Sequence, residues 1–235
     1  EPSSAASAER ILLCIDLTEA VMDEAIAWGA ELIVAYHPPL FAGAKRLTQA
    51  VPLQRSILRA VHHGVAIYSP HTALDATTGG VCDWLAGGLG ALADSRPIEP
   101  VAERPEEGAG RLVTLAEPAS LEVLTGRLKA HLDLRAVRVA RPDAKGRGIR
   151  TVAVCPGSGG GLFQAVAHAD LFVTGEMQHH DVLARVALGA AVVLTDHTNS
   201  ERGYLPTYEA RLRAALGAAV EVRVSETDTE PLQVV

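Results

Sequence analysis

Side chains that commonly bind metal ions gather just after four short apolar runs, each of which predicts a β-strand. They are His37 after run 31–36, His71 and Asp75 after 65–68, Glu176, His179 and His180 after 171–174, and Asp196, His197 and Glu201 after 191–195. Imidazole nitrogens and carboxylate oxygens suit Zn, Fe, Mn or Ni, and a bridging carboxylate can hold two ions. The pattern therefore predicts a site for divalent metal ions.

Each of these residues also has a structural interpretation. His37 could be a loop residue that hydrogen-bonds to the backbone, and Asp75 could cap a turn or a helix. Glu201 follows Thr198 at the spacing of a capping box. His179 and His180 are adjacent and cannot share one face of a helix. The repetition at four strand ends, rather than any single residue, favours the metal site.

In such a site the metal would lower the pKa of water and supply hydroxide at neutral pH. Glu176, His71 and His179 are the candidates for general acid or base, provided that they lie within hydrogen-bonding reach of the substrate. The three cysteines, Cys14, Cys82 and Cys155, show no CxxC spacing, so no thiolate is expected among the ligands.

A glycine-rich string, CPGSGGG (155–161), joins a predicted strand to a predicted helix over 159–169. Such a loop could offer backbone N–H groups to a phosphate. It matches neither the Walker A loop nor GxGxxG, because no Gly-Lys-Ser/Thr follows and Leu162 stands where the last glycine belongs. A tight turn that allows close packing explains the string at least as well.

The elements that must position these residues alternate between strand and helix along the chain. Apolar runs and capping signals predict βαβ units with largely parallel sheets, whose sites lie at the carboxyl ends of strands. Residues 94–110 are rich in Pro, Gly and Glu and lack periodicity, so they predict a connection between two lobes. The expected fold class is α/β, with two lobes over 1–100 and 101–235 and parallel or mixed sheets flanked by helices.

The composition excludes several classes of protein. The chain has 235 residues, 48% of them hydrophobic and 21% charged, with a formal net charge of −7. This is a globular composition without a broad basic surface, so neither disorder nor nucleic-acid binding is expected. No apolar run approaches the roughly 18 residues of a membrane span. We expect a cytoplasmic protein that does not bind membranes, and further residues upstream of Glu1, since the chain does not begin with Met.

Five longer strings together resemble the Nif-three-like proteins, also known as GTP cyclohydrolase 1 type 2 homologues. They are LIVAYHPPLF (32–41), YSPHTALDATTGGVCDWLA (68–86), VAVCPGSGGGLF (152–163), LFVTGEMQHHDVLA (171–184) and LTDHTNSERGYL (194–205). The resemblance implies the two-lobed fold of that family, a toroidal homohexamer and two divalent metal ions per chain. It also implies that His37, Asp75, His197 and Glu201 are metal ligands, with Asp75 or Glu201 as the bridging carboxylate.

One departure concerns the second metal ion. Many family members have His-His-Pro where this chain has Tyr36-His37-Pro38, so a phenol stands in the place of a ligand histidine. A phenol with a pKa near 10 is a poor ligand unless the metal deprotonates it. His71, Glu176 and His179 are the candidates to replace the missing ligand or to support the others.

Three functions follow as hypotheses. The first is a metal-dependent hydrolase that acts on a purine nucleotide such as GTP, as the resemblance implies. The second is a non-enzymatic hexamer that binds metal and protein partners such as transcription regulators. The third is a nucleotide-binding regulator that uses the CPGSGGG loop.

Overall fold

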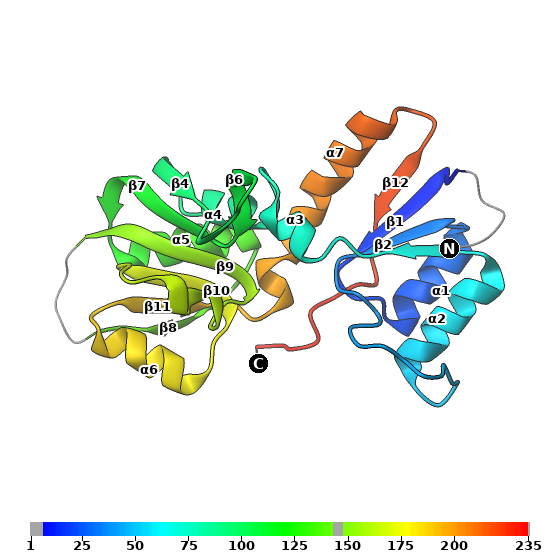
Figure 1. Cartoon of the computed structure of the whole chain (residues 1–235), viewed down its shortest axis with the longest axis horizontal. Coiled ribbons are helices and arrows are strands. Elements are labelled where there is room, and N and C mark those ends of the chain that lie inside the picture. The colour runs from blue at the N-terminus through cyan, green and yellow to red at the C-terminus, as the bar shows by residue number, and fades with distance from the viewer. Residues whose placement is uncertain (1–6, 143–147, 235) are drawn as a thin grey trace. The chain divides into compact units, whose positions relative to one another are not determined.

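The chain folds into two α/β units (Figure 1). The computed structural model describes residues 7–142 and 148–234. The first unit holds the chain up to His71 together with Leu205–Pro231, and the second holds Thr72–Tyr204 and the residues from Leu232 onward.

The first unit is built on a four-stranded parallel sheet with the order β12-β1-β2-β3. Its elements are β1 (Arg10–Cys14), α1 (Glu19–Trp28), β2 (Leu32–Ala35), α2 (Pro52–His63), β3 (Ala66–Tyr68), α7 (Leu205–Leu216) and β12 (Glu221–Val224). Helices α1 and α2 lie together on one side of this sheet, while α7 packs on β12 and β1 (Figure 1). Thr18 caps α1 by accepting from the Val21 N–H at 3.2 Å, and Gly29 ends the helix at φ 73°.

The sequence of strand β1 is a nearly continuous apolar run because both of its faces are buried. Leu12 and Cys14 face α1 and α2 in one cluster, while Ile11 and Leu13 are also buried. Parallel strands covered on both faces typically lose the alternation of polar and apolar residues. This is why the short run was recognisable as a strand.

The second unit contains a six-stranded mixed sheet with the order β4-β7-β9-β10-β11-β8. Its elements are α3 (Thr72–Ala76), α4 (Val81–Gly87), β4 (Leu92–Arg96), β5 (Glu99–Val101), β6 (Arg104–Ala109), β7 (Arg111–Ala119), α5 (Leu121–Leu132), β8 (Arg138–Ala140), β9 (Ile149–Ser158), η1 (Leu162–Ala165), β10 (Leu171–Glu176), α6 (His179–Ala187), β11 (Ala191–Leu194), η2 (Thr198–Ser200) and η3 (Arg202–Tyr204). Strands β9, β10 and β11 are parallel, so their carboxyl ends point the same way. The expected class, α/β with parallel and mixed sheets, is confirmed.

Two apolar clusters hold the faces of this sheet. Leu85 of α4 and Leu124 and Leu128 of α5 pack with Val152 and Val173 on one face. Phe163 and Phe172 lie in the cluster on the other face, with their ring centroids 5.1 Å apart. The sheet is therefore covered on both sides beneath the ends of β9, β10 and β11.

Two local expectations were wrong. Residues 94–110 do not connect two lobes, because they lie within the second unit, where they complete β4 and form the β5–β6 hairpin. These strands are exposed and rich in Pro and Glu, so they carry no apolar alternation. The helix expected over 159–169 is only the short 3-10 turn η1, since three successive glycines disfavour a helix and Val166 is extended.

The division into units also differs from the expected boundary at residue 100. The chain passes into the second unit at Thr72 and returns to the first at Leu205. The reason is β12, which pairs with β1 from Arg10↔Glu221 to Leu13↔Val224 and so brings the end of the chain into the first sheet. Within the described ranges, no helix is long and apolar enough to span a bilayer.

Candidate metal centre

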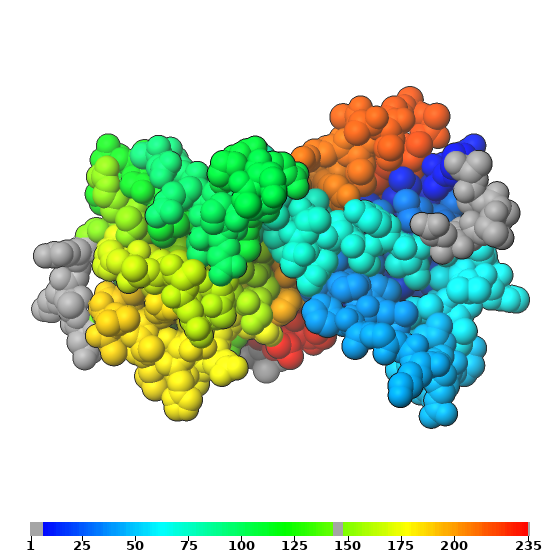
Figure 2. All heavy atoms as spheres, viewed as in Figure 1, coloured from blue at the N-terminus to red at the C-terminus, as the bar shows by residue number. Residues whose placement is uncertain are grey.

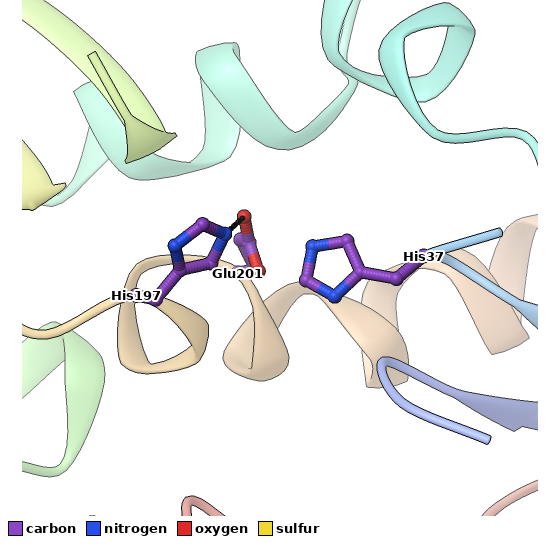
Figure 3. A group of neighbouring side chains, drawn as sticks. All are labelled: His37, His197 and Glu201. Atoms are coloured by element: carbon purple, nitrogen blue, oxygen red, sulfur yellow. Dashed lines mark ion pairs between the residues drawn. The ribbon is translucent and has the colours of Figure 1, made fainter. Parts of the chain in front are cut away.

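His197 and Glu201 come together in the second unit, just beyond the carboxyl end of β11. His197 Nε2 lies 3.6 Å from Glu201 Oε1, as the dashed line in Figure 3 marks. Glu201 is buried, whereas His197 is half-buried. The short turn η2 separates the two residues and directs both side chains to the same place. A nitrogen and an oxygen donor at this distance have the chemistry of a metal-ligand pair.

Gly157 makes room for this pair. Its φ is +61°, and a Cβ at this position would lie 2.6 Å from Glu201 Oε1 and 3.0 Å from His197 Nε2. Any larger residue would fill the space where the two donor atoms lie, in a backbone conformation that favours glycine. The glycine at the end of β9 is therefore part of the construction of the site.

Hydrogen bonds lock the turn that carries His197 and Glu201 onto β9. The Gly157 N–H donates to Ser200 Oγ at 2.7 Å, and Ser200 Oγ donates to the His197 carbonyl at 2.6 Å. Asn199 Nδ2 donates to the Thr195 carbonyl at 2.9 Å. Ser200 is fully buried, so its two bonds are shielded from water.

The same contacts decide between the two interpretations of CPGSGGG. The Gly157 N–H is directed to Ser200, and the Gly159 N–H donates to Thr174 Oγ1 at 2.9 Å. A Cβ on Gly159 would lie 2.8 Å from both Cys155 Cβ and Thr174 Oγ1. Both N–H groups already donate to acceptors within the protein, so the structure favours a close-packed turn over a phosphate-binding loop.

Glu176 holds His197 from the opposite side of the ring. Glu176 Oε2, at the end of β10, lies 3.1 Å from His197 Nδ1. A carboxylate on one imidazole nitrogen orients the ring and leaves the other nitrogen, here Nε2, for a metal. Glu176 was predicted as a general acid or base, and its contact indicates that it positions His197.

His37 has the same arrangement in the first unit. It follows β2, and its N–H donates to the Ile15 carbonyl at 3.0 Å, so the backbone is fixed to the end of β1. Asp16 Oδ1 lies 2.9 Å from His37 Nδ1. Asp16 was not predicted, although it lies two residues after the end of β1 and the strand-end rule could have found it.

Asp228 in turn holds the segment that carries Asp16. Its carboxylate accepts from the Ile15 N–H at 2.6 Å, and Asp228 is buried. These contacts join residues 213 positions apart in the sequence. No local pattern could have predicted them.

His71 lies beside His37 within a group of aromatic rings. Its ring centroid is 5.7 Å from those of both His37 and Tyr36, and 5.9 Å from that of Phe41. Its backbone has a φ of 40°, which is unusual for a residue other than glycine. Tyr36 is buried, and its ring centroid lies 5.0 Å from that of His37.

Asp75 lies on α3 in the second unit, where its charge acts on the same surroundings as that of Glu201. Burial, followed by the charges of Asp75 and Glu201, raises the pKa of the Cys155 thiol to about 12. Burial, followed by the charge of Asp75, also raises the pKa of Cys82. Both sulfurs therefore stay protonated near neutral pH.

The remaining predicted residue, His179, is not brought to these side chains. It is exposed at the start of α6, and its ring packs on His180 at a centroid distance of 5.5 Å. Asp196 has a positive φ of 68° and pairs with Arg138 at 2.7 Å. Among the described residues, the side chains that could bind a metal ion include His197 and Glu201 in the second unit and His37 in the first, all labelled in Figure 3.

Comparison with known proteins gives concordant matches over the whole chain. A family model described as Duf34/NIF3 (NGG1p interacting factor 3) matches residues 2–231. The "Protein NIF3 homolog" of Schizosaccharomyces pombe is 40% identical, over 98% of this chain and 86% of that protein. The "NGG1-interacting factor 3" of Saccharomyces cerevisiae is 38% identical, over 96% of this chain and 81% of its own.

Solved structures share the fold at lower identity. A hypothetical protein of Staphylococcus aureus, SA1388, gives a TM-score of 0.83 at 24% identity, with 97% of this chain and 88% of that chain covered. A Bacillus cereus protein related to NIF3 gives 0.82 at 22% identity, covering 97% and 90%. These likenesses establish the fold.

Proposed function

Because the chain belongs to the Duf34/NIF3 family, we propose that it is a metal-dependent hydrolase with a dinuclear centre. The proposed ligands are His37, Asp75, His197 and Glu201, with Asp75 or Glu201 as the bridging carboxylate. The cofactors are two divalent ions per chain, drawn from Zn, Fe, Mn or Ni, since nitrogen and oxygen donors suit all four. A purine nucleotide such as GTP is the proposed substrate.

One observation carries the proposal: two histidines each have Nδ1 held by a carboxylate. Asp16 holds His37 at 2.9 Å and Glu176 holds His197 at 3.1 Å. Both rings are thereby oriented with Nε2 as the nitrogen for a ligand, which is the usual support of a metal-bound histidine. The space left by Gly157 beside His197 and Glu201 adds to this support.

Divalent ions in this centre would lower the pKa of water and so provide a nucleophile at neutral pH. Asp16 and Glu176 hold the ligand histidines in position. We assign proton transfer to His71, because its ring lies beside His37. A role for His179 in proton transfer stays a prediction.

Metal content per chain tests the centre. Protein purified without an affinity tag or added metal is measured by mass spectrometry beside His197→Ala and the control His63→Ala, which changes an exposed histidine at the end of α2. We expect about two ions per chain, retained in the control and lost in His197→Ala. One ion would mean that Tyr36 has removed the second site. No ion, even after reloading with each of the four metals, would refute the proposal.

Turnover of GTP by the metal-loaded protein tests the activity. We expect product formation that EDTA and His197→Ala abolish and His63→Ala preserves. An absence of turnover across a broad panel of nucleotides, with the metals in place, would separate the metal centre from hydrolysis.

A second candidate function is a metal-binding hexamer that binds proteins such as transcription regulators. The name of the Saccharomyces cerevisiae relative, "NGG1-interacting factor 3", favours it. Under this hypothesis the metals are structural, and a closed ligand shell without water would be expected. Light scattering tests the proposed homohexamer: a mass near six chains supports it, and a monomer argues against it.

A further inference from the structure

The segment that follows His37 exposes an aromatic side chain to solvent. Residues 40–46 are all exposed, and the blue part of the space-filling view shows the chain at the surface of the first unit (Figure 2). Phe41 is 82% exposed, the highest value among the large hydrophobic residues of the described chain. A ring this open to solvent has a face on which a planar base can stack.

The ring of Phe41 continues a row of rings that begins at the proposed ligand His37. Its plane is tilted 84° to that of His71, and the plane of His71 is tilted 68° to that of His37. Edge-to-face contacts of this kind fix the relative orientation of the rings. Phe41 contacts His71 in this geometry and is 82% exposed, so most of its surface stays open to a further planar group.

His71 is held in a strained backbone conformation at the centre of this row. A φ of 40° is unusual at a residue other than glycine and persists only where the surroundings enforce it. Such strain is often found at binding sites. Here it places one imidazole between Phe41 and His37.

The same segment is positively charged in an acidic protein. Residues 37–50 include Lys45 and Arg46 and no Asp or Glu, although the whole chain carries a net charge of −7. Both cations are exposed, and neither has an ion pair within residues 7–142 and 148–234. An exposed ring followed in the sequence by two cations without acidic partners matches a ligand that combines an aromatic base with an anionic group.

We propose that Phe41 and His71 form a stacking subsite for the planar base of a mononucleotide, whose phosphates are bound by Lys45 and Arg46. The inference rests on the proposed function for its relation to the metal centre, because the row of rings leads to His37. Binding itself requires neither metal nor turnover. The subsite would bind the base, and the reaction would take place at the proposed metal centre.

Calorimetric titration of the full chain with GTP, ATP and guanosine tests this subsite. Phe41→Ala and Phe41→Leu should each weaken binding about tenfold or more, because leucine retains the apolar character and lacks the ring. Phe41→Tyr keeps an aromatic ring and should bind with the affinity of the unaltered chain. The control Leu40→Ala, which removes a neighbouring apolar side chain that is 45% exposed, should bind as the unaltered chain does.

The charges are tested with the double variant Lys45→Ala/Arg46→Ala. It should weaken GTP binding and reduce its salt dependence, while guanosine binding stays unchanged. Equal affinity of Phe41→Ala and the unaltered chain, or full affinity of Phe41→Leu, would overturn the subsite. So would a failure of all three compounds to bind.

Two further results separate the possible outcomes. If Phe41→Ala changes only the molecular mass in light scattering, the ring belongs to a contact between copies and the inference fails. Nucleotide binding that depends on Phe41 but proceeds without turnover would support the subsite and contradict the hydrolase. Turnover of GTP that is unaffected by Phe41→Ala would support the hydrolase and contradict the subsite.

Discussion

The two histidines of the proposed centre are supported in different ways. His197 and Glu201 belong to a turn that buried hydrogen bonds fasten to β9, and Gly157 shapes the space beside them. His37 is held by Asp16 and by ring contacts, next to a segment that is exposed throughout. The difference teaches that the donors of the second unit are pre-organised by several hydrogen bonds within one buried turn, whereas the backbone of His37 is held by its single N–H bond to Ile15.

The largest effect is expected from Gly157→Val. Its side chain would occupy the space of Glu201 Oε1 and force a β-branched residue into a φ of +61°. We expect loss of the bound metal and destabilisation of at least about 1–3 kcal/mol. Metal analysis and thermal unfolding are the measurements. Gly161→Val is the matched control, because a Cβ there meets nothing within 4 Å; equal behaviour of the two variants would contradict the role of Gly157.

Removing the carboxylates compares the two histidines directly. Asp16→Asn and Glu176→Gln should each lower metal affinity by about 10- to 100-fold, because each amide supports the histidine less well. We expect the larger loss for Asp16→Asn, since fewer backbone contacts hold His37. Titration with a competing chelator measures both, with the exposed Glu117→Gln as control. A larger loss for Glu176→Gln would reverse the comparison.

Ser200→Ala tests the buried link between β9 and the turn. The substitution leaves the Gly157 N–H without its acceptor in a site shielded from water. We expect a loss of about 1–3 kcal/mol in unfolding free energy and a smaller loss of metal affinity than in the carboxylate variants. Chemical denaturation monitors the first and chelator competition the second. Unchanged stability would show that the turn does not need this bond.

The smallest effect is expected from pH, through His131, a half-buried residue of the second unit. Burial lowers the pKa of His131, against a hydrogen bond to the Trp84 backbone that raises it. The unfolded chain therefore binds the proton more readily, and stability falls as pH drops below about 6.5. Between pH 7.5 and 5.5 the unaltered chain should lose more stability than His131→Phe, by less than about 1 kcal/mol. Parallel pH profiles of the two would exclude this contribution.

Sequence patterns predicted the elements whose burial is visible in the sequence as a run of apolar residues. Strands such as β1 and β11 are continuous apolar runs, and the rule that sites follow strand ends pointed to His197 and Glu201. The β5–β6 hairpin was missed because its exposed strands are polar. Asp228 and Gly157 were missed as parts of the site for another reason: their roles depend on contacts with Ile15 and Glu201, which are distant in sequence. No local periodicity records such contacts.

The pairing of β12 with β1 has a consequence for the newly made chain. The ribosome releases the first three strands of the parallel sheet early, but their last partner only after the whole second unit has emerged. During that interval the edge of β1, with its apolar side chains, has no neighbour on one side. The second unit is nearly continuous in sequence and can fold in the meantime. The parallel sheet of the nascent first unit is therefore incomplete until β12 has left the ribosome.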